Sequence, residues 1–317
     1  PNVIWITTDQ QRFDTIRALG NEHIRTPNLD RLVAEGTAFT HAFCQNPICS
    51  PSRASFLTGR YPRTTRLRQN GAKIPDDEVL VPRILADHGY RRGLSGKLHL
   101  DSCDGKMETR IDDGYQEFHW SHGPWPKWKE NDYISWVDEQ GTPWAEIYPL
   151  TPEVANTLGP KGTAPDGRMA WAGMPVHLHQ SYWCAEMALE FMQTYRDQPW
   201  FFSMNPFDPH HPFDPPQEMF DHYDPDSLPS PRYKDGELDN KPIFQRIDTY
   251  GSYGGNGMDF QNSTDREHRE VIAAYYAMVE NVDYNVGRIL DYLDESGQRE
   301  NTLVIFMSDH GEMLGDH

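Results

Sequence analysis

The sequence predicts an α/β fold with a mainly parallel or mixed central sheet and helices on both faces. Two observations lead to this prediction. Short apolar segments alternate along the chain with longer segments of helical period, a pattern typical of parallel sheets covered on both sides. Titratable residues directly follow several apolar segments, where open α/β sheets bind ligands. The 317 residues allow one large domain with insertions or about two domains.

The first part of the chain contains one predicted strand and three predicted helices. Residues 3–6 form a β-branched and aromatic run, typical of a buried strand. Residues 26–36 begin with Thr26 as the expected N-cap, followed by proline, and end at glycine, which predicts a helix. A second helix is expected to begin at residues 49–51. The third covers residues 81–88 and is ended by a glycine.

Further strands and helices continue the alternation. Residues 92–95 form a short second strand, and residues 200–204 form a third, more apolar one. A helix is expected at residues 182–195. The segment 264–295 has apolar side chains every three to four residues, which predicts a long helix with one buried face. The last strand is expected at residues 302–307.

Two long segments show no sustained period. Residues 101–175 are rich in Trp, Pro and Gly and are interpreted as an insertion, and residues 212–262 as a loop. Clustered tryptophans stack on sugars in some proteins, but a small core that holds the insertion together is the favoured interpretation. The tryptophans in question are Trp120, Trp125, Trp128, Trp136, Trp144 and Trp171.

Composition excludes several classes of protein. There are 29 Lys and Arg residues against 48 Asp and Glu residues, a formal net charge of −19, which argues against a general nucleic-acid binder. The longest apolar run, residues 303–307, is too short to span a membrane. Residues 36–75 lack acidic side chains, so a small anion could be attracted there. That segment contains Arg53, Arg60, Arg63, Arg66, Arg68 and Lys73.

The cysteines predict neither a disulfide scaffold nor a zinc-ligand spacing. They are Cys44, Cys49, Cys103 and Cys184. The compartment stays open: periplasmic or secreted if a signal peptide was removed, and cytoplasmic otherwise.

Residues at both ends of the chain are candidate ligands of a divalent cation. Asp9 and Gln10 follow the first predicted strand, and Asp309 and His310 follow the last. Carboxylate and amide oxygens suit a hard ion such as Ca²⁺ or Mg²⁺, and one histidine does not require zinc.

The segment that begins Cys49-Ser50-Pro51-Ser52-Arg53 and continues to Leu57-Thr58-Gly59-Arg60 resembles the signature of the type I sulfatases. These enzymes belong to the alkaline-phosphatase-like superfamily. The resemblance implies that Cys49 is converted to formylglycine, the nucleophile once hydrated. It also implies that Arg53, one helical turn away, holds this group.

The resemblance covers nearly the whole chain and implies roles for other residues. Asp9-Gln10 and Asp309-His310 resemble the two metal pairs of the family, with Gln10 where many members have Asp and His310 where others have Asn. Residue 49 would complete the metal ligands. Further residues would contact the substrate: Lys97 and His99 in Gly-Lys-x-His, His210 near the leaving group, the neighbouring His211, and Asn70.

The resemblance implies a sulfatase that cleaves a sulfate ester, of a carbohydrate or a small organic molecule, with one divalent cation. Ca²⁺ is the expected ion, with Mg²⁺ and Mn²⁺ as alternatives. A formylglycine-generating or sulfatase-maturating enzyme is the implied partner. The metal pairs also resemble those of phosphonate monoester and phosphodiester hydrolases, which is the first alternative. A non-catalytic binder of sulfated glycans is the second.

Family members continue beyond the second metal pair with another active-site lysine and a smaller C-terminal subdomain. We therefore expect residues 1–317 to be the catalytic domain of a truncated chain that lacks this C-terminal part.

Overall fold

The computed structural model describes residues 1–103, 106–124, 130–147, 173–234, 236–247, 249 and 263–316. Its centre is a five-stranded sheet with the strand order β3-β2-β4-β1-β5, in which every neighbouring pair is parallel. The strands are β1 (Asn2–Thr8), β2 (Arg91–Gly96), β3 (Glu117–Trp120), β4 (Trp200–Asn205) and β5 (Thr302–Ser308).

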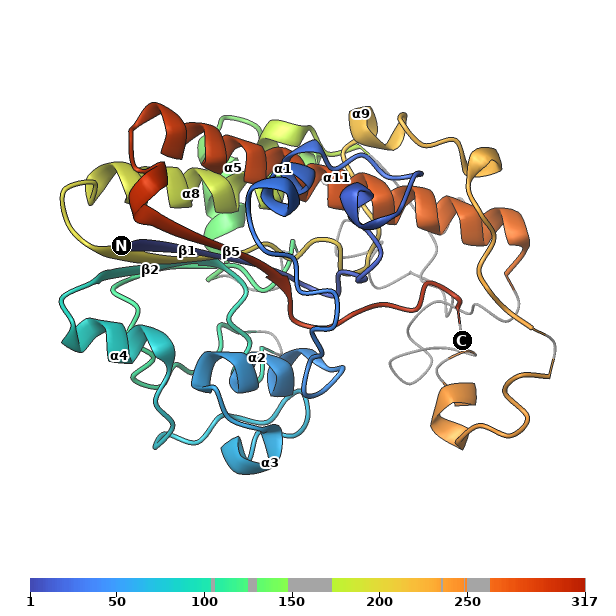
Figure 1. Ribbon diagram of the computed structural model, residues 1–317, viewed down its shortest axis with the longest axis horizontal. Helices are drawn as coiled ribbons and strands as arrows, with labels where there is room; N and C mark the ends of the chain where they lie inside the picture. The colour runs from blue at the N-terminus through green and yellow to red at the C-terminus, as the bar shows by residue number, and fades with distance from the viewer. Residues whose placement is uncertain are drawn as a thin grey trace.

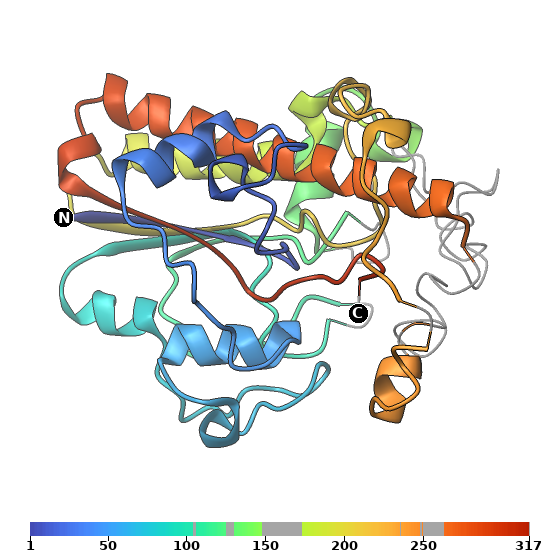
Figure 2. The ribbon, with the colours of Figure 1, turned by 45° about the vertical axis from the view of Figure 1, so that its right-hand side comes forward.

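Helices cover both faces of this sheet (Figure 1). One face carries α1 (Pro27–Glu35), α8 (Gln180–Thr194) and α11 (Asp265–Glu295). The other carries α2 (Cys49–Thr58), α3 (Pro62–Thr65) and α4 (Val81–Asp87). The predicted α/β fold, with a parallel sheet between two helical layers, is therefore confirmed. The turned view shows the strands ending on the side where the C-terminus lies (Figure 2).

Alternating side chains of the strands supply both halves of the core, as the period of two in a strand requires. Ile4 and Ile6 of β1 pack with Phe202 of β4 in the cluster under α8 and α11. Phe201 of β4 points to the opposite face and packs with Leu94 and the residues of α2. The inner strands β1 and β4 are thus covered on both sides, which is why they form continuous apolar runs in the sequence.

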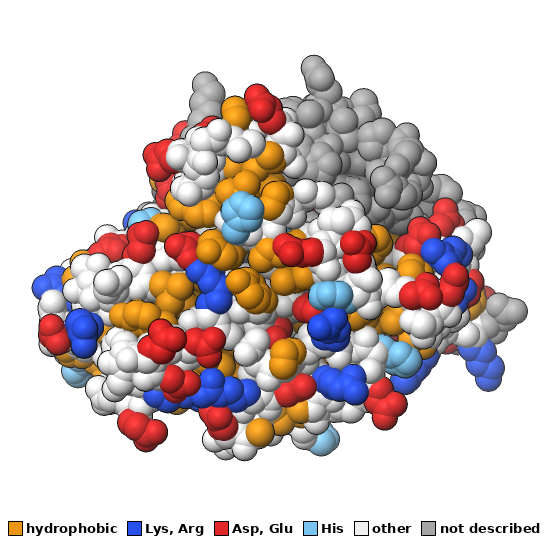
Figure 3. All heavy atoms as spheres, turned by 90° about the horizontal axis from the view of Figure 1, so that it is seen from above, with side chains coloured by type: hydrophobic (Ala, Val, Ile, Leu, Met, Phe, Trp, Pro, Cys, Tyr) orange, Lys and Arg blue, Asp and Glu red, His pale blue; other side chains and the backbone are white. Residues whose placement is uncertain are grey.

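The long helix α11 begins where the sequence predicts. Thr264 Oγ1 accepts a hydrogen bond from Glu267 N (3.2 Å), and Thr264 N donates to Glu267 Oε2 (2.6 Å), which is a capping box. The outer face of this layer carries acidic and basic side chains side by side (Figure 3). Ion pairs on it include Arg31–Asp294 and Arg288–Glu186.

The segment 101–175 differs from its sequence interpretation. It contains β3, an edge strand of the central sheet, and the helices α5 (Asp132–Glu139) and α6 (Trp144–Ile147). β3 has only four residues and is half-buried, so it leaves no periodic signal. Trp120 and Trp144 are buried and Trp136 packs against the core, which favours packing for these three. Trp125, Trp128 and Trp171 lie outside the described residues.

The predicted loop 212–262 also contains short elements. Its described part holds α9 (Gln217–Phe220) and a 3₁₀ turn at Pro225–Ser227. None of the described helices is both long enough and apolar enough to cross a membrane.

Candidate active site

The carboxyl ends of four strands bring the predicted site residues to one edge of the sheet. Asp9 follows β1, Lys97 follows β2, His210 lies beyond β4 and Asp309 follows β5. Gly96 makes the sharp exit from β2 possible: its φ is +96°, and a Cβ there would lie 2.0 Å from Asn205 O. Only glycine fits both constraints.

Cys49 is the first residue of α2 and is buried. Its Sγ lies 3.1 Å from His310 Nε2 and 3.5 Å from Asp9 Oδ1. The backbone N–H groups of a first helical turn lack helical partners and favour anions. Asn70 Oδ1 accepts a hydrogen bond from one of these groups, Ser50 N (3.0 Å). Asn70 therefore contacts the residue that follows the candidate nucleophile.

Two buried cations neutralise the carboxylates of the site. Arg53 is fully buried and donates to Asp309 Oδ2 (2.9 Å) and to Asp9 Oδ2 (3.3 Å). Lys97 is also buried and forms an ion pair with Asp9. Burial alone would raise the pKa of Asp9, yet Lys97 and Arg53 hold that pKa well below its usual value. Asp9 is therefore an anion throughout the neutral range.

The arrangement fits a hard divalent cation. Ligand atoms of Asp9, Cys49, Asp309 and His310 lie within 4.8 Å of one another. Gln10 Oε1 is buried and has no hydrogen-bond partner among the described residues, which is the expected state of an oxygen that serves a metal. The charge of His310 also fits a cation site. Although burial opposes protonation, Asp309 and Cys49 raise the pKa of His310 to about 10. A cation would replace that positive charge.

Three histidines of the site, unlike His310, are neutral at neutral pH: His99, His210 and His211. Burial and the positive charge of Lys97 lower the pKa of His99 well below its usual value. Burial and the neighbouring His211 do the same for the pKa of His210. His210 Nδ1 faces the backbone oxygen of His211 at 2.5 Å, and the two rings stack with centroids 4.1 Å apart. Burial also lowers the pKa of His211.

Several residues that hold the site in place were missed by the sequence analysis. Glu108, on the segment after β2, accepts hydrogen bonds from His99 N (2.8 Å) and Leu100 N (2.6 Å). It thereby fixes His99 in a left-handed conformation, with φ 61°. No motif marks this carboxylate, because its partners are mostly backbone groups of a turn.

Two other side chains support the loop after β1. Tyr275 of α11 donates to Gln10 O (2.5 Å) and accepts from Arg12 N (2.7 Å). Gln10 Nε2 donates to Glu312, which leaves Gln10 Oε1 directed elsewhere. Tyr275 lies in the apolar stripe of the predicted helix. Its hydroxyl, a polar group on a buried face, was the one sign in the sequence that this residue forms hydrogen bonds.

The sulfatase family model matches residues 1–317. The chain belongs to the sulfatase family. An arylsulfatase of Clostridium perfringens (strain 13 / Type A) is 29% identical over 333 residues, which cover 100% of this chain and 64% of the relative. A multifunctional alkaline phosphatase superfamily protein of Trinickia caryophylli is 30% identical over 339 residues, again covering 100% and 64%. The chain thus spans just under two thirds of the length of these relatives.

Solved structures support the same assignment of fold. The phosphonate monoester hydrolase of Agrobacterium radiobacter superposes with a TM-score of 0.81 at 27% identity, covering 100% of this sulfatase-family chain and 64% of that chain. The resemblance to the sulfatases and to the alkaline-phosphatase-like fold, stated from the Cys49 segment, is confirmed.

Proposed function

We propose that the protein is a sulfuric ester hydrolase that uses a formylglycine formed from Cys49. The observation that carries the proposal is the position of Cys49. Its Sγ faces Asp9 and His310 at the start of α2, with Arg53 and Lys97 neutralising the carboxylates beside it. This combination supports a nucleophile held next to a cation and to an anionic substrate.

Asp9, Gln10, Asp309, His310 and residue 49 would hold one divalent cation, with Ca²⁺ proposed on the grounds of the oxygen ligands. When bound, this ion would favour the ionised hydroxyl of the nucleophile and withdraw charge from the sulfuryl oxygens.

Three groups of the chain would contact the ester itself. The ammonium of Lys97 would take a sulfuryl oxygen, since it is buried and paired with Asp9 beside Cys49. Asn70, which already contacts the first turn of α2, would contact the substrate beside it, and His211 would line the leaving-group side.

His210 and His99 are the candidates for the proton transfer to the leaving alcohol. With Nδ1 of His210 facing the His211 carbonyl, that nitrogen carries the hydrogen and Nε2 is left for the substrate. A neutral imidazole cannot give a proton from Nε2. An anionic ester beside it raises the pKa of the ring, because an opposite charge favours the protonated form. Substrate binding would therefore prepare the acid.

In the proposed reaction, one hydroxyl of hydrated formylglycine loses its proton to solvent and attacks sulfur, and the alcohol leaves with a proton from the histidine. The second hydroxyl then returns a proton to that histidine and expels sulfate, which leaves the aldehyde, and water hydrates the aldehyde again. Arg53 would hold the diol, because its guanidinium already spans Asp9 and Asp309.

Phosphonate monoester or phosphodiester hydrolysis is the second candidate. It is favoured by Gln10 and His310 in the metal pairs and by the similarity to the Agrobacterium radiobacter enzyme. The same nucleophile and cation would serve a phosphorus centre.

The test combines mass spectrometry with competing substrates. The peptide containing residue 49 is isolated from protein made in its native host and treated with a carbonyl reagent. We expect a labelled formylglycine and a higher kcat/KM for an aryl sulfate than for a phosphonate monoester or phosphodiester. The reverse preference would establish the second candidate. An unmodified cysteine with retained binding of sulfated glycans would overturn both and indicate a binding protein.

A further inference from the structure

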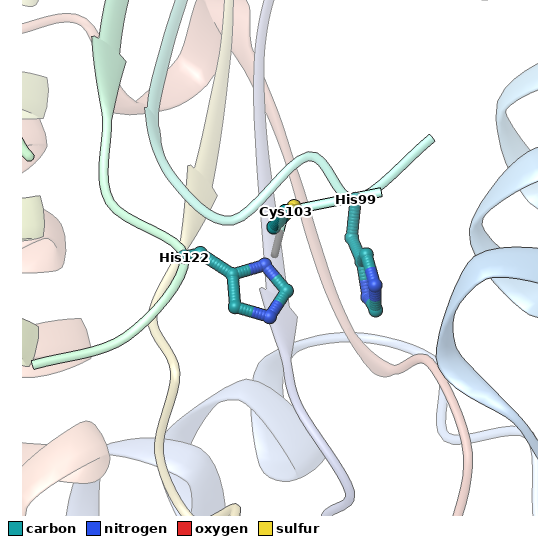
Figure 4. Close-up of side chains that lie close together, drawn as sticks. All are labelled: His99, Cys103 and His122. Carbon is teal, nitrogen blue, oxygen red and sulfur yellow. The ribbon is translucent and has the colours of Figure 1, made fainter. Parts of the chain in front are cut away.

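A second group of potential metal ligands lies beside the proposed active site. The segment after β2 contributes His99 and Cys103, and the segment after β3 contributes His122 (Figure 4). Figure 4 shows the two imidazoles on either side of the Cys103 side chain. Ligand atoms of the three residues lie within 4.8 Å of one another. The sequence spacing of the cysteines gave no hint of this group, because the pairing of β3 with β2 is what brings His122 near.

An unsatisfied nitrogen indicates that the group accepts a ligand. His99 is 7% exposed, and its Nδ1 has no hydrogen-bond partner among the described residues. Buried polar atoms without a partner are rare and unfavourable. The ring of His99 meets that of His122 edge to face, with centroids 4.4 Å apart. A metal ion bound at this nitrogen would remove the deficit.

The charge states of the three residues also suit a metal. Burial lowers the pKa values of both His99 and His122, so both rings are neutral and keep a lone pair for coordination. Burial and the nearby Glu108 raise the pKa of Cys103, so the thiol is protonated before binding. Coordination would release that proton to solvent, as is usual for thiolate ligands.

We propose that His99, Cys103 and His122 form an inhibitory site for Zn²⁺. Two imidazoles and one thiolate are ligands that zinc prefers, whereas the oxygen-rich group around Asp9 suits a harder ion. The ligand atoms are close enough that small side-chain rotations bring them to the roughly 2.0–2.3 Å bond lengths of zinc. The fourth position stays open to water.

Inhibition follows from the double role of His99 and rests on the proposed function. A zinc ion on the His99 ring would withdraw His99 from the substrate and place a second positive charge near Lys97. The active site would then bind its substrate less well and lose a candidate proton donor. Binding of zinc itself does not depend on the proposed function, so the two are separable.

The binding test uses Co²⁺ as a spectroscopic substitute for zinc. The protein is kept in excess Ca²⁺ to occupy the hard site and titrated with Co²⁺. We expect one equivalent to bind with a thiolate-to-cobalt absorption band that Zn²⁺ abolishes. The band should persist in Cys49→Ala and in Cys44→Ser, whose thiol is exposed, and disappear in Cys103→Ser. A band that survives in Cys103→Ser, or no binding in the unmodified protein, would overturn the proposal.

The inhibition test compares the zinc sensitivity of turnover. His122→Gln changes a residue that is only partly buried and keeps His99 and Lys97. Loss of a residue that only hydrogen-bonds to a metal ligand weakens metal binding by roughly 10- to 100-fold. Removing one of the three ligands themselves should therefore weaken zinc inhibition by at least this factor. Equal sensitivity of the variant would overturn the inhibitory role. A protein without turnover would instead contradict the proposed function, while the cobalt band would still report on the site.

Discussion

Arg53 is a buried cation that joins residues from the two ends of the chain. Its guanidinium donates to Asp9 and Asp309, whose strands lie side by side in the sheet. Removing one member of such a buried group leaves uncompensated charges and costs about 3–5 kcal/mol. We expect Arg53→Ala to lower the free energy of unfolding by about this amount, measured by urea denaturation.

A matched control for this change is Arg83→Ala. Arg83 pairs with Asp87 and Asp112, but all three side chains are exposed. Exposed pairs contribute only about 0.2–1 kcal/mol, so this variant should unfold nearly like the unmodified protein. Similar losses in the two variants would show that Arg53 does not act through its buried pairs.

Glu108 offers a second test at the scale of single residues. Its two oxygens accept from His99 N, Leu100 N and Trp120 Nε1. In Glu108→Gln an amide N–H₂ would face one of these donors, which breaks a bond and costs about 1–3 kcal/mol. We expect the turn at His99 to shift and kcat for a sulfate ester to fall by more than tenfold, while KM changes little.

The outcome separates positioning from stability. Unfolding curves of the Glu108→Gln protein should still be cooperative, and its kcat should be low well below the melting temperature. A lower melting temperature with unchanged kcat would mean that Glu108 acts on the fold alone.

Most of the residues that the structure brings together at this edge of the sheet were predicted from the sequence, and the ones that were missed share a physical reason. Asp9 and Asp309 were found because they directly follow apolar strands, and Cys49 because it lies in a recognisable motif. Glu108 was not found, because it acts on backbone N–H groups. The group formed with Cys103 was not found either, because it depends on the register of β3, a strand too short to leave a pattern.

At the scale of elements, a residue of α11 caps the start of α1. The predicted N-cap, Thr26, makes no capping bond with its side chain. Instead, Asp283 Oδ1 accepts from Asn28 N (3.0 Å) and Leu29 N (2.7 Å). The two helices approach closely there, as Gly287 shows: a Cβ at this position would lie 2.6 Å from the Asn28 side chain. Tertiary contact has replaced the local cap.

This cap makes stability depend on pH. Burial raises the pKa of Asp283 to about 6, above the usual carboxyl value of about 3.9. Between these values the folded state binds more protons than the unfolded state, so stability falls as pH rises from about 4 to 6. The loss is ~3 kcal/mol for a shift of two pKa units. We expect Asp283→Asn to remove this slope in unfolding experiments across that range.

The control is Asp291→Asn on the same helix, where the carboxyl is 72% exposed. This variant should keep the slope of the unmodified protein. An unchanged slope in Asp283→Asn would show that another group titrates. Asparagine can still accept both backbone bonds at one oxygen, so the comparison concerns charge rather than the cap itself.

Elements were predicted where burial gives a pattern. The apolar runs of β1, β4 and β5 and the one-sided stripe of α11 correspond to the observed bounds within one or two residues. α2 has a predictable start but not a predictable length, because nearly all of its residues are buried and no polar face marks a period. β3 escaped prediction as a four-residue edge strand.

At the scale of the whole molecule, the order of the strands was beyond sequence reasoning. β1 lies between β4 and β5, so the first strand of the chain occupies an inner position of the sheet. Apolar runs predict that strands are buried, but the pairing of Asn2 with Thr302 and of Thr8 with Ser308 depends on packing across the whole chain. That pairing brings the two candidate metal pairs, Asp9-Gln10 and Asp309-His310, together.

Because the proposed cation bridges segments almost 300 residues apart, it should stabilise the entire fold. A ligand that binds only the native state adds about 2.7 kcal/mol at a concentration 100 times its Kd. We expect Ca²⁺ to raise the melting temperature of the chelator-treated protein. Mg²⁺ should raise it less, because Mg²⁺ tends to keep its water ligands, whereas this site offers carboxylate and amide oxygens and a histidine. Asp309→Asn should abolish the response, whereas Asp291→Asn should keep it. A response that survives in Asp309→Asn would place the ion elsewhere, and no response in the unmodified protein would contradict a cation at this edge of the sheet.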